Sequence, residues 1–521
     1  MSRISPIDAL TGKAARCTDL RPWPRFRVDV PGWLRAAAVL DDGGCGLAGY
    51  WGEPGRVNLA LIETPAEAAT DVRKGRSRIC VVSLDCPAGR FPSVAAVFPP
   101  AIRLERTICE LHGMQADGNP DPRPWLDHGC WPARAGAPAA APAAGPRPTR
   151  FAGGGESLHQ IPVGPVHAGI IEPGHFRFTC SGETVVRLEE RLGYVHKGIE
   201  SLMAGAPLEK AARLAGRISG DSTVAYAIAF AQAVEAATKT VVPERAVWLR
   251  ALMAELERIA NHLGDIGAIC NDAAFAVMLA HCGVLRERVL RAADACFGHR
   301  LMMDRVVPGG VAADLTADGR AAVEGVIAEA RARLPELAEL YDKTTSLQDR
   351  TVNTGILRPD LARRFGCGGV IGRASGRAVD ARRQPGYPPY DQLPFDIPAA
   401  EAGDVDARVR VRFAEVVRSL SLIAHTLARM PAGPVLAEVS PPGGDEPAEG
   451  LALVEGFRGD ILLWVRLRPD GTVDRCHARD PSWFQWPLLE AVIEGNIVAD
   501  FPLCNKSFNC SYSGHDLWPC A

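Results

Sequence analysis

The chain has 521 residues, 47% of them hydrophobic and 23% charged, and a formal net charge of -3. This length allows a large core and several domains, whereas the near-neutral charge gives no global basis for binding nucleic acid or an anionic membrane. The longest apolar run, residues 224–237, is interrupted by Gln232 and Glu235, so we expect no membrane-spanning helix.

The beginning of the chain, Met1-Ser-Arg-Ile-Ser-Pro6, lacks the apolar stretch of a signal peptide, and no secretion is expected from it. The fifteen cysteines are therefore expected to be mostly reduced, and no two have C-x-x-C spacing. This spacing argues against a self-contained zinc or iron-sulfur site. A Rossmann fingerprint and a P-loop are also missing, so NAD is not expected to bind this chain.

Residues 1–132 mix short β-type runs such as 78–84 with Pro and Gly breaks, followed by an expected helix at 101–111. This mixture predicts an α+β domain. Residues 133–157 are mainly Ala, Pro and Gly without an apolar period, which predicts an extended linker.

The remainder, residues 158–521, opens with an alternating run that predicts a β-hairpin with its turn at 181–182. Residues 244–263 are the clearest helix, with leucines along one stripe and Gly264 as the expected end. A second helix is expected at 284–297.

Three polar residues lie beside the leucine stripe of the first of these helices. Glu255, Arg258 and His262 occupy positions i, i+3 and i+7, so they are expected to line one side of the helix together. Taken alone, this row indicates a structural ion pair with a histidine near the helix end.

Four motifs follow one another in the second part: G-P-x-H at 164–167, G-E at 182–183, G-Y-x-H-K-G-x-E at 193–200 and E-L-x-R-x-x-x-H at 255–262. This order resembles the 49-kDa subunit of respiratory complex I and the large subunit of formate hydrogenlyase, a nickel-iron hydrogenase. The resemblance implies that 158–521 is a mainly α-helical large-subunit-like domain with a small N-terminal β-hairpin.

The first part resembles the 30-kDa subunit of complex I, through residues 91–106, E-L-H-G at 110–113 and P-D-P-R at 120–123. Thr107 and Asn119 depart from that pattern. The formate-hydrogenlyase subunit is also a fusion of 30-kDa-like and 49-kDa-like parts. The alternative is that the expected helix only presents a solvated charged face, formed by Arg103, Glu105 and Arg106.

Nickel-iron hydrogenases hold their metal with four cysteine thiolates. Counted along the motifs, these places fall on residues without a thiol, namely Ser219, Ser222, Ser511 and Gly514, while Tyr226 takes the place of a histidine. A serine hydroxyl is hard and far less acidic than a thiol, so the resemblance argues against nickel and against any metal held by this chain's own ligands. Cys504 and Cys510 have a spacing unlike that of a ligand pair and are expected to be buried small hydrophobes.

In complex I the corresponding cavity is a quinone pocket at the end of an iron-sulfur wire. The histidine and tyrosine that face the quinone there fall on Ile171 and Gly220, so both hydrogen bonds to its head group are lost. A quinone would need other groups, for which the nearest candidates by sequence are His167, His175, Tyr226 and His515.

The resemblance also suggests residue roles. His262 lies in the segment that in complex I approaches the terminal [4Fe-4S] cluster of the neighbouring subunit, with Arg258 beside it as a cofactor-binding residue. Lys197 stands where the family has the Arg of H-R-G, and with His262 it is expected to tune that cluster. His167 is a further catalytic candidate. Glu183 is expected to be a proton-relay carboxylate, and its alternative is a turn-end carboxylate in water.

We therefore expect a peripheral-arm subunit of a membrane-bound complex I-like or hydrogenase-like oxidoreductase that passes electrons from a partner's cluster to a quinone-type or other acceptor. The expected partners are a small iron-sulfur subunit and integral proton-channel-type subunits on the cytoplasmic face of the inner membrane. The alternatives are a nickel-iron hydrogenase large subunit and a catalytically silent scaffold. Nickel would identify the former, and a bound quinone or redox-linked proton change would exclude the latter.

Overall fold

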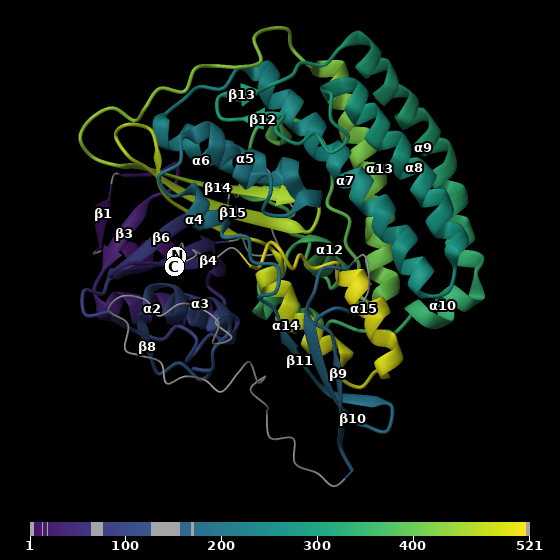
Figure 1. The fold of residues 1–521 in the computed structure, drawn as a ribbon, viewed down its shortest axis with the longest axis horizontal. Helices are drawn as coiled ribbons and strands as arrows, with labels where there is room; N and C mark the ends of the chain where they lie inside the picture. Colours follow the sequence, from purple (N-terminus) through teal and green to yellow (C-terminus); the bar gives the residue numbers. More distant parts are fainter. Residues whose placement is uncertain are drawn as a thin grey trace.

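The computed structural model describes residues 5–12, 14–17, 19–63, 77–126, 157–167 and 171–516. The predicted linker, 133–157, lies outside these residues except for Ser157. In Figure 1 the sheet of β14 and β15 lies between the N-terminal sheet on one side and long helices on the other.

The N-terminal part is built on a five-stranded sheet with the order β1-β3-β6-β5-β4. β3 and β6 are parallel and the other pairs are antiparallel. The strands of this part are β1 (Ala15–Cys17), β3 (Arg25–Val28), β4 (Gly46–Glu53), β5 (Arg56–Glu63) and β6 (Arg78–Asp85), with a separate pair of β7 (Arg90–Pro92) and β8 (Gln115–Asp117). Its helices are α1 (Pro6–Thr11), α2 (Val30–Asp41), η1 (Pro99–Ala101) and α3 (Ile102–His112). The predicted α+β class and the predicted helix are confirmed.

The two parts of the chain share a sheet. The N-terminal strand β2 (Leu20–Arg21) runs parallel to β14 (Ala448–Gly456) and becomes the edge of the order β16-β15-β14-β2. β15 (Gly459–Leu467) and β16 (Val473–Arg479) complete this sheet. Trp51 of β4 packs on Trp464 of β15, with the ring centroids 5.8 Å apart. The first part is therefore joined to the second by both backbone pairing and core packing.

The predicted hairpin is present. β10 (His175–Ser181) pairs with β11 (Thr184–Arg191) on one side and β9 (His159–Val163) on the other. It projects from the body of the molecule beneath α14 and α15 (Figure 1).

Long helices form the far layer (Figure 1). They are α6 (Thr223–Thr238), α7 (Glu244–Asp272), α8 (Ala276–Phe297), α9 (Ala317–Lys343) and α13 (Val405–Arg429). The prediction that Gly264 ends α7 is wrong, because the helix continues to Asp272. Gly264 and Gly267 instead lie where α8 comes close: a Cβ on Gly267 would meet the Cα of Leu279 at 3.0 Å. These glycines allow close packing of the two helices.

Shorter elements complete the second part. Before α7 they are α4 (Ile199–Met203), α5 (Leu208–Ala215) and η2 (Gly220–Ser222). Later ones are β12 (Val306–Val307), β13 (Gly310–Val311), α10 (Thr345–Thr351), α11 (Pro359–Arg364), α12 (Gly369–Ala374), η3 (Arg382–Gly386), η4 (Tyr390–Gln392), α14 (Ser482–Ile493), η5 (Val498–Asp500) and α15 (Phe501–Phe508). The mainly helical second part with its small sheet agrees with the expected class.

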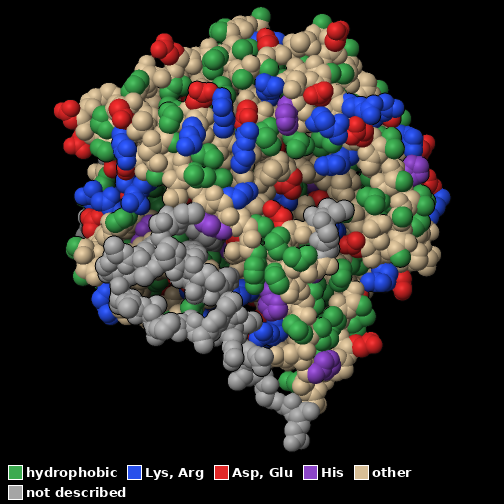
Figure 2. Space-filling view, viewed as in Figure 1, with side chains coloured by type: hydrophobic (Ala, Val, Ile, Leu, Met, Phe, Trp, Pro, Cys, Tyr) green, Lys and Arg blue, Asp and Glu red, His purple; other side chains and the backbone are tan. Residues whose placement is uncertain are grey.

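The visible surface mixes charges of both signs among apolar side chains (Figure 2). Within the ranges that the structure describes, no helix combines the length and the apolar character needed to cross a bilayer.

Candidate functional site

The four places that correspond to hydrogenase cysteines lie together in the fold. Ser219 precedes η2 and Ser222 ends it, whereas Ser511 and Gly514 come from the segment after α15. Ser219 Oγ and Ser511 Oγ are 2.9 Å apart, and the Gly514 backbone N–H donates to Ser511 Oγ over 2.9 Å. We call this group, completed by Ser222, the serine cluster. The sequence therefore located the site correctly across nearly 300 residues.

A buried arginine occupies the space beside the serine cluster. Arg458, which follows β14, donates to both carboxylate oxygens of Asp221 over 2.7 and 2.6 Å and to Ser222 Oγ over 3.2 Å. Ser219 Oγ also donates to Asp221. Burial disfavours the charged carboxylate, but Arg458 outweighs this effect and leaves the pKa of Asp221 below its ordinary value.

Tyr226 closes the other side of the cluster. Its side chain is fully buried, and its hydroxyl donates to Asp480 Oδ2 over 2.5 Å. Asp480 Oδ1 accepts the backbone N–H of Ser482, whose hydroxyl in turn accepts the backbone N–H of Ser511. Burial, and then the Asp480 charge, raise the pKa of Tyr226 far above its ordinary value. The tyrosine is thus a fixed hydrogen-bond donor.

These residues do not fit a nickel-iron centre. The hydroxyls of Ser219 and Ser511 are hydrogen-bonded to each other, and the Arg458 cation lies against Ser222. A Cβ at Gly514 would stand 2.6 Å from Asp480 Oδ2, so a side chain has no room there. Hard, neutral hydroxyls beside a fixed cation are poor ligands for nickel. In the described part of the chain, moreover, no three His, Cys, Asp or Glu side chains are grouped as metal ligands.

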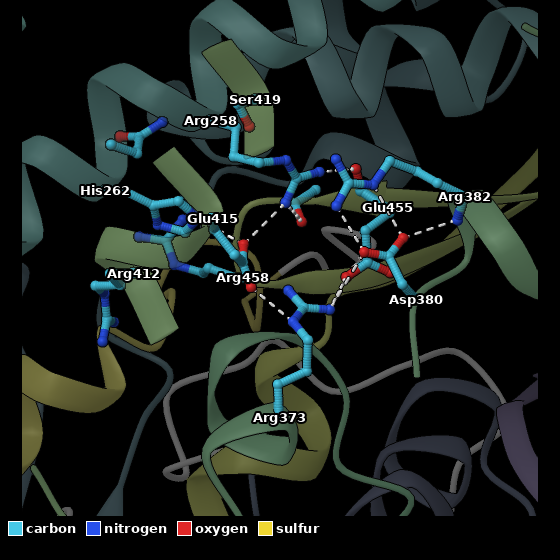
Figure 3. Close-up of polar contacts among 12 residues, drawn as sticks. Arg258, His262, Arg373, Asp380, Arg382, Arg412, Glu415, Ser419, Glu455 and Arg458 are labelled. Atoms are coloured by element: carbon cyan, nitrogen blue, oxygen red, sulfur yellow. Dashed lines mark hydrogen bonds and ion pairs between the residues drawn. The ribbon is translucent and has the colours of Figure 1, made fainter. Parts of the chain in front are cut away.

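A second buried cluster lies next to the first and contains the predicted row on α7. Figure 3 shows carboxylates placed between guanidinium groups from several elements. Glu415 of α13 contacts His262 Nε2 at 2.8 Å and Arg373 Nε at 2.6 Å. Arg373 of α12 also reaches Glu455 of β14 at 2.9 Å. We call this chain from His262 through Glu415 and Arg373 to Glu455 the charge network.

The charge network continues towards η3 and η4. Arg382 binds Asp380 over 2.6 Å and Glu255 over 2.9 Å. Glu255 also accepts hydrogen bonds from the hydroxyls of Tyr390 and Ser419. The predicted pairing of buried Arg and Asp residues is confirmed, and removing one member would leave its partner unpaired.

The members of the charge network differ in proton affinity. Burial opposes the charge on Glu415, but Arg373 and His262 hold the pKa of this carboxyl well below its ordinary value. Burial and the neighbouring Asp380 raise the pKa of Glu455 to about 7. Burial lowers the pKa of His262 despite Glu415, which favours the neutral imidazole with its proton on Nε2. Glu455 is therefore the carboxyl suited to gaining and losing a proton near neutral pH.

The two clusters are connected. Arg458 donates to the backbone carbonyl of Asn509 over 2.5 Å, and the Asn509 side chain donates to Asp265 over 2.8 Å. Asp265 lies on α7 one turn after His262 and accepts from Arg412 over 3.0 Å. Polar contacts thus run from the serine cluster to α7 and α13 without leaving the interior.

The predicted residues on α7 lie within this arrangement. His262 is fully buried in this chain, and Arg258 donates to the backbone carbonyls of Gly456 and Glu455. Lys197 Nζ donates to the carbonyls of Arg217 and Ile218, directly before the serine cluster. Lys197 therefore holds the loop of the first serine pair. The tuning of a partner's cluster by these residues stays a prediction.

The four groups considered for a quinone do not share a cavity. Tyr226 is hydrogen-bonded to Asp480, and His515 is fully buried, stacked on Trp483 with the ring centroids 3.7 Å apart. His167 packs edge-on against Phe176. Only His175 lines a described cavity, of about 390 Å³, between α3 and β11. Burial lowers the pKa of His175.

Glu183 lies elsewhere. It occupies the exposed turn between β10 and β11, where its carbonyl accepts the Val498 N–H. No described contact joins its side chain to the serine cluster or the charge network. The expectation of a proton-relay role for Glu183 is therefore corrected to its alternative, a solvated turn-end carboxylate.

Sequence reasoning did not single out several central residues. Arg458, Asp480, Glu415 and Glu455 come from strands or helices whose neighbours gave no motif. The sequence signal available was their charge within apolar runs, since a charged residue in a buried strand or helix requires a partner. Cys504 and Cys510 are buried, as expected, and burial raises the pKa of Cys504 to about 12.

Glu257 is a further buried carboxyl beside the serine cluster. It accepts the backbone N–H groups of Val224 and Ala225 at the start of α6, over 2.7 and 3.1 Å. Burial raises the pKa of Glu257 to about 8. Because the folded state then binds this proton more tightly than the unfolded state does, its contribution is full below the unfolded pKa. That contribution is lost as the pH rises to about 8.

Replacing Glu257 by glutamine should flatten this pH dependence. Between pH 5 and 8 the free energy of unfolding of the wild type should fall by up to about 1.4 kcal/mol per pH unit more than that of E257Q. Denaturant titrations across that range measure both slopes, and the lost backbone hydrogen bond adds only a constant offset. Parallel slopes for the two proteins would show that Glu257 does not titrate in this window.

The arrangement defines the class of protein. A helical domain in which a loop before a buried helix and the C-terminal segment bring four ligand places together has the organisation expected of a hydrogenase-type large subunit, here without its thiolates. Residues 272–444 match the family model of the respiratory-chain NADH dehydrogenase 49 Kd subunit, and residues 60–142 match that of the 30 Kd subunit.

Similar proteins come from both branches. Formate hydrogenlyase subunit 5 of Escherichia coli (strain K12) is 30% identical over 84% of this chain and 78% of its own length. Membrane-bound hydrogenase subunit alpha of Pyrococcus furiosus is 30% identical over 67% and 85%, and an NADH-quinone oxidoreductase subunit of Syntrophobacter fumaroxidans is 31% identical over 66% and 93%. The chain belongs to the family of complex I 49-kDa subunits and hydrogenase large subunits, as a fused relative that carries a 30-kDa-like part.

Proposed function

We propose that this chain is a peripheral-arm subunit of a membrane-bound oxidoreductase in which electrons pass from a partner's iron-sulfur cluster to a quinone-type or other acceptor. The proposal includes a small iron-sulfur subunit and integral proton-channel-type subunits as partners, and a place on the cytoplasmic face of the membrane. Its support from known proteins is the similarity to the membrane-bound hydrogenase of Pyrococcus furiosus and to the NADH-quinone oxidoreductase of Syntrophobacter fumaroxidans.

The observation that carries the proposal is the charge network. It leads from His262, the residue expected nearest a partner's cluster, through Glu415 and Arg373 to Glu455, with each contact at 2.9 Å or less. A cluster in a partner would supply or remove electrons. The residues of this chain would hold the compensating proton, for which Glu455 with a pKa of about 7 is suited.

The alternatives make different use of the same site. The donor set of the serine cluster opposes a nickel-iron hydrogenase, because no thiolate stands at any of the four places. A silent scaffold would keep the charge network for packing alone. Only the redox proposal requires that electrons reach an acceptor and that a proton of the charge network take part.

The purified native complex, supplied with reduced methyl viologen, distinguishes the three functions. We expect viologen oxidation coupled to reduction of decylubiquinone, without hydrogen gas. Hydrogen evolution would favour the hydrogenase, and no oxidation with either acceptor would favour the scaffold. Both results are read in one vessel, by absorbance and by gas chromatography.

A matched pair of variants tests the proton role in the same assay. Glu455→Gln removes the titrating carboxyl and should slow quinone reduction about 100-fold, a typical loss when a positioned proton-transfer group is removed. Glu446→Gln changes an exposed glutamate in the preceding loop and should leave the rate unchanged. Equal rates in the two variants, with intact complexes, would remove Glu455 from the mechanism.

A further inference from the structure

A second cavity, of about 360 Å³, lies where the N-terminal part meets the second part. The first part contributes α3 and β4, and the second contributes α4, β15, β16 and the start of α14. Gly52 allows α3 to approach β4 here, since a Cβ would meet Ile108 Cγ2 at 2.7 Å. The cavity is thus a product of the docking between the two parts, and its volume is typical of a small-molecule site.

The walls of this cavity are largely aromatic. Tyr50, Trp51, Trp464 and Trp483 all line it, and aliphatic side chains of α3 face them. The His477 ring stacks on Trp51 with an angle of 14° and a centroid distance of 5.7 Å. Flat rings that already stack on one another form a surface on which a further flat ring packs well.

One carboxylate oxygen in the wall has no partner. Glu200 Oε1 accepts the Ala478 backbone N–H at 3.1 Å and lies 3.2 Å from His477 Nδ1. The other oxygen, Oε2, is not hydrogen-bonded by any residue in the described ranges, although the side chain is only 16% exposed. A half-buried carboxylate oxygen favours a donor such as a hydroxyl or N–H group.

A buried donor lies on the same wall. The Trp51 side chain lines the cavity, and within the described part of the chain its Nε1–H finds no acceptor. Buried polar groups in native proteins nearly always have a partner, so an acceptor on a ligand would remove this exception. Arg468 and Arg475 near the cavity disfavour a cationic ligand.

We propose that this cavity binds a flat, uncharged aromatic molecule of one or two fused rings that carries a hydroxyl or ring N–H group. The rings of Trp51, Trp464 and Trp483 hold its face, and Glu200 Oε2 accepts its hydrogen. The site is independent of the proposed electron transfer, because it requires neither a partner cluster nor a proton carrier.

The cavity nevertheless lies next to the serine cluster. Glu200 is three residues after Lys197, which holds the loop before Ser219, and Trp483 stacks on His515, the neighbour of Gly514. A ligand here would contact both parts of the chain and a wall of the serine cluster. Its binding should therefore stabilise the docking of the N-terminal part.

Isothermal titration of the full chain, within its native complex, with 2-naphthol tests the proposal. Wild type should bind one equivalent saturably, and 2-methoxynaphthalene, which keeps the rings but has no hydrogen to donate, should bind at least about tenfold more weakly. Ala204→Trp adds bulk at an exposed position of the cavity wall and should abolish binding.

Two glutamate variants complete the test. Glu200→Gln keeps an acceptor for Ala478 but loses the charge, and it should weaken 2-naphthol binding by about tenfold. Glu209→Gln changes an exposed residue paired with Arg213 on α5 and should bind like the wild type. Absence of saturable binding to the wild type, or equal binding of 2-naphthol by wild type, A204W and E200Q, would overturn the proposal.

Discussion

Replacing Arg373 by alanine should lower the free energy of unfolding by about 3–5 kcal/mol, the usual cost of breaking a buried ion pair. The Arg373 side chain is fully buried and lies between Glu415, at 2.6 Å, and Glu455, at 2.9 Å, with Asp380 at 3.5 Å. Its removal leaves carboxylates that lose their principal counter-charge in a medium of low polarity. Denaturant unfolding of the full chain, followed by circular dichroism, measures the loss.

The matched control for Arg373 is Arg418→Ala. Arg418 also binds a carboxylate, that of Asp396 at 2.6 Å, but both side chains are largely exposed. Exposed pairs contribute at most about 1 kcal/mol, so R418A should unfold almost like the wild type. Similar small losses in R373A and R418A would mean that the charge network rearranges freely and is not a fixed structure.

Introducing a cysteine at Gly514, the fourth hydrogenase place, should destabilise the fold by about 1–3 kcal/mol through overpacking. The added Cβ would lie 2.6 Å from Asp480 Oδ2 and 2.9 Å from Ser511 Oγ. Asp480 cannot move away at no cost, because it accepts from Tyr226 and from the Ser482 backbone. The midpoint of thermal unfolding measures this effect.

Gly220→Ala is the control for Gly514→Cys. Gly220 lies in η2, next to Ser219, but a Cβ there meets no atom within 4 Å. Its replacement should change the stability by less than about 0.5 kcal/mol. If G514C were as stable as G220A, the space beside Asp480 would be open to a side chain, and the argument against a thiolate ligand at this place would fail.

Local sequence patterns predicted the elements well where periodicity was strong. The helix at α7, the hairpin of β10 and β11 and the helix α3 all occur where expected, because amphipathic spacing reflects one buried face. The end of α7 was missed, since Gly264 is a helix-ending signal in isolation. The structure uses its lack of a side chain for packing against α8.

The candidate site was predicted only in part. The positions of Ser219 and Ser511 could be inferred from motif spacing, and they do meet at 2.9 Å. Arg458 and Asp480 could not be found in this way, because their roles depend on strands that are paired far along the chain. The sharing of β2 with β14 was likewise invisible, since a strand of two residues carries no periodic signal.

The nickel content per chain of the native membrane complex, measured by mass spectrometry of the metal, tests the central claim most directly. Hydroxyls in mutual hydrogen bonds beside the Arg458 cation should hold no nickel above background. Near-stoichiometric nickel would contradict this account. It would mean that other residues of this chain, or a partner, complete a hydrogenase centre at the serine cluster.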